Sequence, residues 1–163
     1  MSKPIQLIVA CAENRVIGRA GLLPFDIPED KEWFHDRTAN QVVVLGRICF
    51  ETWPRVQLDG RKPVVITRNR ALASDTVRVA ANATEALSIA QELPGEIMVC
   101  GGQRIYEETL PIADRLLLTL VHSVVSGDTY FPEWRQLPWR EAWRREGADA
   151  HFRYTFSILE SAR

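Results

Sequence analysis

Asp30 is the residue whose neighbours most clearly suggest chemistry. It lies in the stretch 23–34, where the chain approaches a helix that should begin at Pro28, a position at which proline loses no hydrogen bond. Asp30 then falls in the first turn, with Phe34 one turn later on the same face. A carboxylate beside an aromatic ring and opposite the apolar Leu23 can bind a flat, amidine-like heterocycle. The alternative interpretation is that Asp30 only complements the helix dipole.

Two helix starts carry capping signals. Asp26 and Glu29 stand three residues apart, which is the spacing of a capping box, and Asn82 and Glu85 repeat that spacing later in the chain. We therefore expect one helix to begin just after each of these two caps.

A second set of residues is suited to binding phosphate. Gly46–Arg47, Thr67–Arg68 and Gly101–Gly102 each follow the end of an apolar run, and Arg104 comes shortly after the last of them. Glycine lets backbone N–H groups approach a phosphate, a helix start adds positive potential, and arginine gives bidentate hydrogen bonds. A Gly-Gly pair alone is often only a tight turn. If all of these groups lie at one edge of a sheet, they predict a binding site for an anionic dinucleotide. The Gly-x-Gly-x-x-Gly fingerprint of the usual dinucleotide site is absent.

Short apolar runs alternate with helical segments through most of the chain, which is typical of a mainly parallel α/β sheet. Residues 13–21 contain two glycines and form a candidate mobile flap. The expected strands are 5–11, 41–46, 63–67, 76–80, 96–100 and 115–121, and the expected helices are 28–38, 47–53, 83–93 and 103–110.

The last third of the chain has a different pattern. Residues 127–132 should form a turn and a short extended piece, and 151–159 alternates with the period of an antiparallel strand. The apolar side chains on one face of that strand are Phe152, Tyr154, Phe156 and Ile158. Three tryptophans in polar surroundings are expected to cover the edge of the core, namely Trp134, Trp139 and Trp143.

Composition narrows the class of protein. The length of 163 residues predicts a single domain over 1–163, and 46% hydrophobic with 25% charged residues is ordinary for a soluble globular chain. A net charge of −1 gives no reason to expect binding to nucleic acid or to a membrane surface. No apolar run approaches the roughly 20 residues that span a bilayer, and the first apolar stretch is too short for a signal peptide.

The cysteines indicate a reducing compartment. Cys11, Cys49 and Cys100 are odd in number and lack the spacing of metal ligands. We interpret Cys11 and Cys100 as small buried hydrophobic residues rather than as halves of a disulfide. The expectation is a cytoplasmic protein with no metal site.

The sequence resembles those of a known family, the dihydrofolate reductases, over essentially the whole chain. The resemblance implies a single-domain, three-layer α/β fold with an eight-stranded, mainly parallel sheet, an antiparallel C-terminal strand and four flanking helices. The matching stretches are 12–18, 23–34, Gly46–Arg47, 60–62, Gly101–Gly102 with 104–106, and 127–132.

The resemblance also implies a function. The enzyme would use NADPH to transfer a hydride to C6 of 7,8-dihydrofolate, giving 5,6,7,8-tetrahydrofolate for one-carbon metabolism, and it would act as a monomer. Asp30 would hydrogen-bond the pterin N3 and 2-amino group and favour protonation at N5, with Thr119 behind it. Arg61 would pair with the α-carboxylate of the substrate's glutamate. A cis peptide bond between Gly101 and Gly102 is implied as well.

The remaining site residues follow from the same resemblance. The substrate pocket would be formed by Ile8, Leu23, Phe25, Lys31, Phe34, Leu58, Arg61, Cys100, Tyr106 and Thr119. The cofactor would contact Ala10, the flap residues Val16, Ile17, Gly18, Arg19, Ala20, Gly21 and Leu22, the group Gly46, Arg47, Ile48, Cys49, Thr67 and Arg68, and the loop and helix residues Gly101, Gly102, Gln103, Arg104, Ile105 and Tyr106.

Three departures from the family pattern bear on the pocket. Phe25 stands where the family usually has tryptophan, Lys31 replaces an apolar residue, and Cys49 replaces a threonine. These changes suggest an altered fit of the substrate tail and reduced sensitivity to antifolates such as trimethoprim. Two alternatives therefore stay open: an NADPH-dependent reductase of another pterin or a related pyrimidine, such as dihydromethanopterin, and a nucleotide-binding module without turnover.

Overall fold

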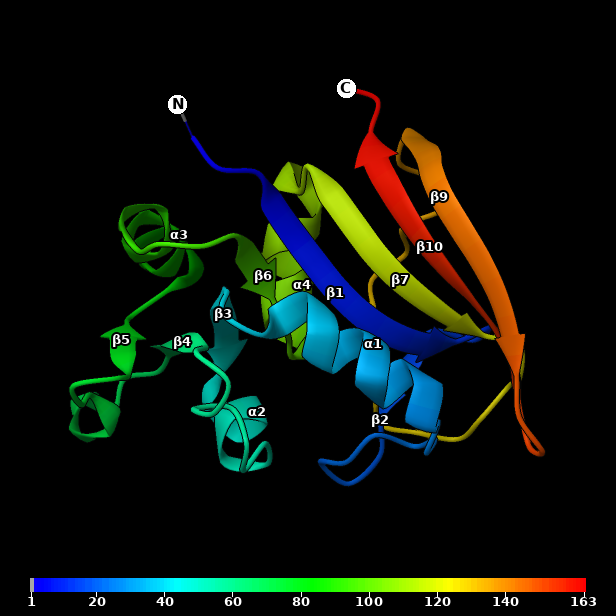
Figure 1. The fold of residues 1–163 in the computed structure, drawn as a ribbon, viewed down its shortest axis with the longest axis horizontal. Helices are drawn as coiled ribbons and strands as arrows, with labels where there is room; N and C mark the ends of the chain where they lie inside the picture. The colour runs from blue at the N-terminus through cyan, green and yellow to red at the C-terminus, as the bar shows by residue number, and fades with distance from the viewer. Residues whose placement is uncertain (1) are drawn as a thin grey trace.

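The computed structural model describes residues 2–163 and arranges most of them around one eight-stranded sheet (Figure 1). The strands run in the spatial order β5-β4-β3-β6-β1-β7-β10-β9. All neighbouring pairs from β5 to β7 are parallel, whereas β10 is antiparallel to both of its neighbours. The strand bounds are β1 Ile5–Ala12, β3 Val42–Gly46, β4 Lys62–Ile66, β5 Arg78–Ala80, β6 Ile97–Val99, β7 Arg115–Val121, β9 Trp139–Ala148 and β10 Arg153–Ser161.

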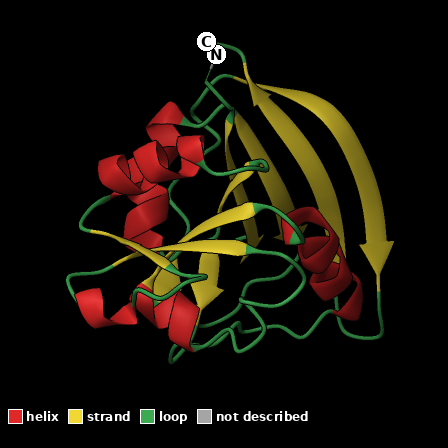
Figure 2. Cartoon of the chain, turned by 60° about the vertical axis from the view of Figure 1, so that its left-hand side comes forward, coloured by secondary structure: helices red, strands yellow, loops and turns green. Residues whose placement is uncertain are grey.

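Helices cover both faces of this sheet, so the predicted three-layer arrangement is confirmed (Figure 2). In Figure 1, α1 crosses the front of the sheet and α4 lies behind it. The α-helices are α1 Pro28–Thr38, α2 Arg47–Glu51, α3 Ala83–Glu92 and α4 Gln103–Thr109, and two short 3₁₀ helices are η1 Arg70–Leu72 and η2 Leu110–Ile112. A separate two-stranded sheet joins β2 Val16–Gly18 to β8 Thr129–Tyr130.

Strand β1 shows how the sequence fills two hydrophobic layers. Successive side chains of a strand point to opposite faces, and here Leu7 and Val9 enter the layer of α3 and α4, whereas Ile8 enters the layer of α1. Because both faces are covered, the strand is apolar at almost every position, as parallel strands usually are. Each such fully buried side chain contributes about 1.5–3 kcal/mol through removal from water.

The predicted cap at Asn82 is confirmed, and the predicted capping box at Asp26 is wrong. The Asn82 side chain accepts a hydrogen bond from the Glu85 N–H at 2.8 Å, and α3 follows. At α1 the N-cap residue is Ile27, with no side-chain cap, and the exposed Asp26 pairs with Lys31 at 2.6 Å. The physical reason lies in the tertiary structure, where Glu29 is engaged by two residues of the C-terminal strands. Its carboxylate accepts the Tyr154 hydroxyl at 2.7 Å and lies 3.3 Å from Arg145.

An antiparallel edge strand was expected in the C-terminal part of the chain, but the sequence did not predict that residues 139–148 form it, as β9. It lies at the edge of the sheet and is exposed along most of its length, so no buried face imposes a period-two pattern on it. The tryptophans expected to cover this region divide between the layers. Trp134 and Trp139 pack with the layer of α3 and α4, and Trp143 stacks on Trp33 of α1 with ring centroids 5.3 Å apart.

The parallel strands bring their carboxyl ends to one edge of the sheet. Gly46 at the end of β3 pairs in register with Ile66 at the end of β4. The Gly46 N–H also donates to the carbonyl of Gly101, which follows β6, at 2.9 Å. The loops with the phosphate-binding residue types therefore leave the sheet side by side, as the order of the strands predicts.

Candidate active site

Asp30 is buried in the first turn of α1, with 6% of its surface exposed. Burial raises the pKa of its carboxyl from the usual 3.8 to about 6, and a hydrogen bond with the Thr119 side chain partly opposes this shift. The predicted placement of Thr119 beside Asp30 is thus seen in the structure. A carboxyl group that titrates near pH 6 can hold a proton under conditions where an exposed aspartate has lost it.

Apolar side chains from three segments form the hydrophobic layer on the α1 side of the sheet, the side on which Asp30 meets Thr119. Ile8 of β1 and Phe25, which precedes α1, are buried in the layer of α1, and Phe34 packs against that layer. The Phe34 ring lies 4.9 Å from that of Trp53, and the Phe25 ring meets Phe152 edge-on at 6.1 Å. Phe25 therefore takes part in core packing.

The outer residues of the predicted pocket are more exposed. Leu23 and Leu58 are half exposed, and the Lys31 side chain extends into solvent in its ion pair with Asp26. Such a rim of apolar side chains is available to a bound molecule without any core residue moving. Whether Lys31 contacts the substrate stays a prediction.

Arg61 is enclosed at the carboxyl end of α1, with only 2% of its side chain exposed. Its Nε–H donates to the Thr38 hydroxyl at 2.9 Å, and Nη1 donates to the Leu58 carbonyl at 3.1 Å. Nη2 donates to the carbonyl of His35 at 3.4 Å, and its second N–H has no protein acceptor within the described chain. The guanidinium is therefore held in a fixed orientation with one donor available to a carboxylate.

The loop after β6 is shaped by close backbone approach. The Gly101–Gly102 bond is cis, as the resemblance implies, and Gly101 has a φ of +108°. A Cβ on Gly101 would lie 3.0 Å from the Tyr106 ring, and one on Gly46 would lie 3.1 Å from Ile105. Ile105 and Tyr106 are buried, so they support this bare backbone from below rather than line an open surface.

Tyr106 also links the two halves of the candidate site. Its hydroxyl donates to the carbonyl of Ile8 at 2.6 Å, which ties α4 to the central strand β1. Cys100 at the end of β6 is half-buried, and burial raises the pKa of its thiol far above the usual range. The thiol stays protonated and acts as a small apolar side chain.

The predicted 2′-phosphate residues lie at the ends of β3 and β4. Arg47 begins α2 and pairs with Glu51 at 2.6 Å. Thr67 follows β4, and its hydroxyl accepts the Asn69 N–H at 3.1 Å. Arg68 is exposed and forms no ion pair within residues 2–163, so it is the freest cation of the group. Burial raises the pKa of the Cys49 thiol on α2.

The rest of the predicted cofactor residues divide into flap and helix. Ala10 lies on β1 next to the active-site layer, Val16, Ile17 and Gly18 form β2, and Arg19, Ala20, Gly21 and Leu22 form an exposed turn. Gln103 and Arg104 begin α4, where Arg104 is almost fully exposed and pairs with Glu108 at 3.6 Å. Ile48 on α2 is exposed at the same edge.

The resemblance assigned no role to the residues that hold the flap. The Asp128 carboxylate accepts the Ala20 N–H at 2.9 Å, and the Asp128 N–H donates to the Gly18 carbonyl at the same distance. A Cβ on Gly127 would lie 2.3 Å from Val16, so only glycine allows this approach. The Gly-Asp pair in the sequence was the available signal, because glycine and aspartate together mark a tight turn.

Two structural findings concern other classes of site. No group of three histidine, cysteine, aspartate or glutamate side chains within residues 2–163 is placed to hold a metal ion. Over the same range, every helix is too short or too polar to cross a membrane.

The comparisons agree with this geometry over nearly the whole chain. The family model described as dihydrofolate reductase matches residues 4–163. The dihydrofolate reductase type 3 of Salmonella typhimurium is 40% identical over 84% of this chain and 83% of its own length. The dihydrofolate reductase of Neisseria gonorrhoeae is 37% identical over 87% of each chain. The solved dihydrofolate reductase from Enterococcus faecalis, complexed with NADP(H) and RAB-propyl, has a TM-score of 0.87 and 28% identity, covering 98% of this chain and 97% of that one.

Proposed function

The chain belongs to the dihydrofolate reductase family, and from this premise we propose that Asp30 is the acid that binds the pterin ring and favours its protonation. NADPH supplies the hydride that is added to C6 of 7,8-dihydrofolate, and a proton is added to N5, so that 5,6,7,8-tetrahydrofolate and NADP⁺ result. The protein is therefore an NADPH-dependent oxidoreductase.

The buried position of Asp30 is the observation that carries this proposal. Its carboxylate can accept hydrogen bonds from the ring N3–H and the 2-amino group, which lie side by side like the nitrogens of an amidine. In the low-dielectric layer formed with Ile8 and Phe25, these bonds are stronger than they would be in water. With a pKa of about 6, Asp30 also exchanges a proton readily, and water can relay it to N5.

The residues at the carboxyl ends of the strands fit NADPH. Gly46, Gly101 and Gly102 present backbone without side chains at one edge, where a pyrophosphate can approach N–H groups. The exposed Arg68, with Arg47 and Thr67, offers cationic and hydroxyl donors for the 2′-phosphate. We propose that these residues set the preference for NADPH over NADH, and that the turn Arg19–Leu22 covers the nicotinamide.

The substrate tail is proposed to lie along the carboxyl half of α1. Arg61 has one unused N–H and a fixed orientation, which suits the α-carboxylate of a glutamate. Lys31 adds an exposed ammonium where an apolar wall is usual in the family. An apolar wall would favour the aromatic ring of trimethoprim, so we propose reduced sensitivity to this inhibitor.

The free cysteines and the charged edge strand support two further proposals. Cys11, Cys49 and Cys100 are all free thiols, which agrees with a cytoplasmic location. Strand β9 carries charged side chains along an exposed edge, and such charges oppose pairing between sheets of different molecules. We propose a monomer that folds as a single domain, which light scattering and a single unfolding transition would test.

The experiment that tests the function is NADPH oxidation at 340 nm. Purified protein should oxidise NADPH with dihydrofolate and much more slowly with dihydrobiopterin, which has no glutamate tail for Arg61. The Asp30→Asn protein should bind NADPH normally and turn over far more slowly. Fast oxidation with dihydrobiopterin alone would assign the protein to another pterin, and near-normal turnover of Asp30→Asn would remove Asp30 from the reaction.

A further inference from the structure

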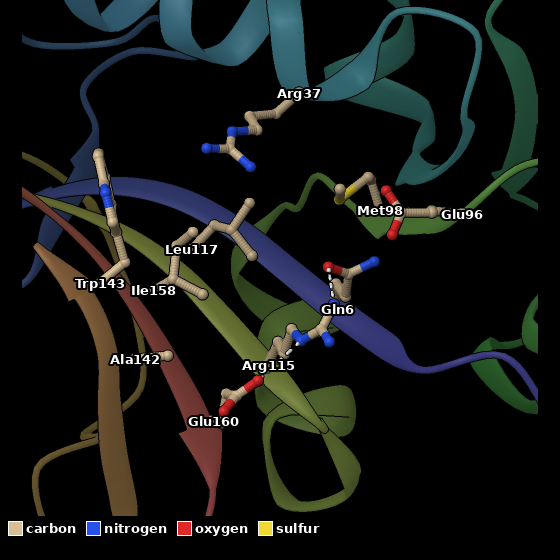
Figure 3. Close-up of a pocket in the computed structure, with 10 residues that line it drawn as sticks. All are labelled: Gln6, Arg37, Glu96, Met98, Arg115, Leu117, Ala142, Trp143, Ile158 and Glu160. Atoms are coloured by element: carbon tan, nitrogen blue, oxygen red, sulfur yellow. Dashed lines mark hydrogen bonds and ion pairs between the residues drawn. The ribbon is translucent and has the colours of Figure 1, made fainter.

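A cavity lies under the carboxyl half of α1 (Figure 3). Its residues Gln6 and Arg115 stand near the starts of β1 and β7, at the end of the sheet opposite the candidate active site. The volume of the cavity is about 270 Å³. Arg37 at its upper rim stands seven residues after Asp30, or roughly 10 Å along the helix. Gln6 at its floor stands four residues before Ala10 on β1. The lining residues that matter here are Gln6, Arg37, Glu96, Met98, Arg115 and Trp143.

Gln6 supplies a hydrogen-bond donor that the protein leaves unused. The residue is 3% exposed, and its Oε1 accepts a bond from Arg115 Nη1 at 3.5 Å. Its Nε2 has no acceptor within the described chain. Buried polar groups in folded proteins nearly always have a partner, so an unpaired amide N–H beside a cavity can serve a ligand acceptor. Neighbouring atoms cover Nε2 in the present conformation, so this bond requires the Gln6 side chain to turn toward the cavity.

Arg37 supplies a cation that no carboxylate neutralises. Its guanidinium packs over the Trp33 ring at 4.3 Å and forms no ion pair within residues 2–163. Figure 3 shows its side chain extending from α1 toward the cavity. Arg115, in contrast, is already paired with Glu160 at 3.4 Å. Arg37 is thus the group that would attract an anion.

The other walls restrict the shape and charge of that anion. Trp143 is stacked on Trp33 with the ring planes only 8° apart, and Met98, Leu117 and Ile158 complete an apolar surface. Glu96 lies at the far rim and forms no ion pair within residues 2–163, whereas Glu160 is paired with Arg115. The charge of Glu96 would repel a second negative charge on the ligand. These features favour a flat, apolar body with a single acidic group.

We propose that this cavity is a second small-molecule site, which binds an aromatic monocarboxylate. The ring lies against Trp143, and the carboxylate accepts a bond from Arg37 and, once the Gln6 side chain has turned toward the cavity, a second bond from its Nε2. A dry cavity of roughly 150 Å³ is enough for benzene. The larger volume here suits two fused rings with a carboxylate.

The test is a calorimetric titration of the protein with 2-naphthoate. The active site is first filled with NADP⁺ and folate, so that binding at the Arg61 region is blocked. We expect one saturable site with a dissociation constant of about 1 mM or lower. Uncharged 2-naphthalenemethanol and doubly charged 2,6-naphthalenedicarboxylate should bind more weakly.

Two variants and one control locate the site. Arg37→Gln should weaken 2-naphthoate binding by roughly tenfold to a hundredfold, because a charge-assisted hydrogen bond is lost. Gln6→Leu should weaken it by a smaller factor, and Arg78→Gln, which changes an exposed arginine on β5, should leave it unchanged. If Gln6→Leu does not fold, the indole N–H resonances of Trp33 and Trp143 in the unmutated protein provide the second measurement and should shift on titration.

The proposal is overturned by any of four results. The first is the absence of saturable binding to the filled enzyme. The second is equal affinity of the unmutated and Arg37→Gln proteins, and the third is equal affinity for 2-naphthoate and 2-naphthalenemethanol. Indole N–H resonances that do not move during saturation would equally exclude this cavity.

Discussion

Replacing Asp30 by asparagine should slow the reaction and stabilise the fold at the same time. Asparagine keeps the size of the side chain but cannot ionise, and it cannot pass a proton to the pterin. Loss of general acid–base help lowers turnover by roughly 10²–10⁴-fold. In the unmutated enzyme, turnover should fall as pH rises through about 6, since Asp30 then loses its proton. The variant should lack that inflection.

The effect on stability follows from the raised pKa. Below pH 3.8 the carboxyl is protonated in both the folded and the unfolded state, so it adds nothing. Between pH 3.8 and about 6 the unfolded chain loses the proton first, and the free energy of unfolding falls as pH rises. Above pH 6 the decrease in the free energy of unfolding is complete. The folded and unfolded pKa values differ by about two units, which corresponds to a decrease of roughly 3 kcal/mol. Asparagine does not ionise, so the Asp30→Asn protein does not lose this stability as pH rises.

Thermal unfolding of both proteins at pH 4 and pH 8 measures this difference. At pH 8 the Asp30→Asn protein should melt higher by up to about 6–12 °C, as expected for a chain of this size, and near pH 4 the two should nearly coincide. Glu32→Gln, which changes an exposed acid on the same helix, should behave like the unmutated protein at both pH values. A variant that is less stable at pH 8, or a pH-independent turnover in the unmutated enzyme, would refute the account of Asp30 as a destabilised buried acid.

Three further predictions concern the cofactor, the substrate tail and the flap. Arg68→Ala should lose part of the preference for NADPH over NADH, by at most about 1.5–3 kcal/mol in the ratio of kcat/KM values, whereas Arg78→Ala should not, and equal losses would show a general charge effect. Lys31→Leu should raise the KM for dihydrofolate less at high salt than at low salt and should lower the inhibition constant of trimethoprim, and unchanged values would leave Lys31 as a surface residue. Gly127→Ala should destabilise the fold by about 1–3 kcal/mol in urea unfolding, because its Cβ would collide with Val16, and unaltered stability would show that the flap simply shifts.

The central strands and the acid were predictable because one strong physical requirement fixes each of them. A strand buried on both faces must be apolar throughout, and β1 and β3 therefore stand out in the sequence. The position of Asp30 followed from Pro28, which sets where the helix begins. The glycine and arginine residues after the strands were predictable for a related reason, since parallel strands end at the same edge.

The errors fall where contacts between distant residues decide the outcome. The capping box at Asp26 failed because Tyr154, more than 120 residues away in the sequence, engages Glu29. Strand β9 was missed because its edge position leaves its side chains in solvent, and no periodic pattern is required there. The cavity beside Gln6 could not be predicted either, because an unpaired amide is recognised only when its surroundings are known.

The two hydrophobic layers on opposite faces of the sheet also affect how the protein can evolve. Leu110 packs in the layer of α4 and Trp33 in the layer of α1, so substitutions at these two positions share no side-chain neighbour. Their effects on the free energy of unfolding should add to within about 0.3–0.5 kcal/mol. A lineage under selection by an inhibitor of the Asp30 pocket can therefore accumulate substitutions in the layer under α1 without compensating substitutions in the layer under α3 and α4. Which substitutions are tolerated under α1 does not depend on those already present in the other layer.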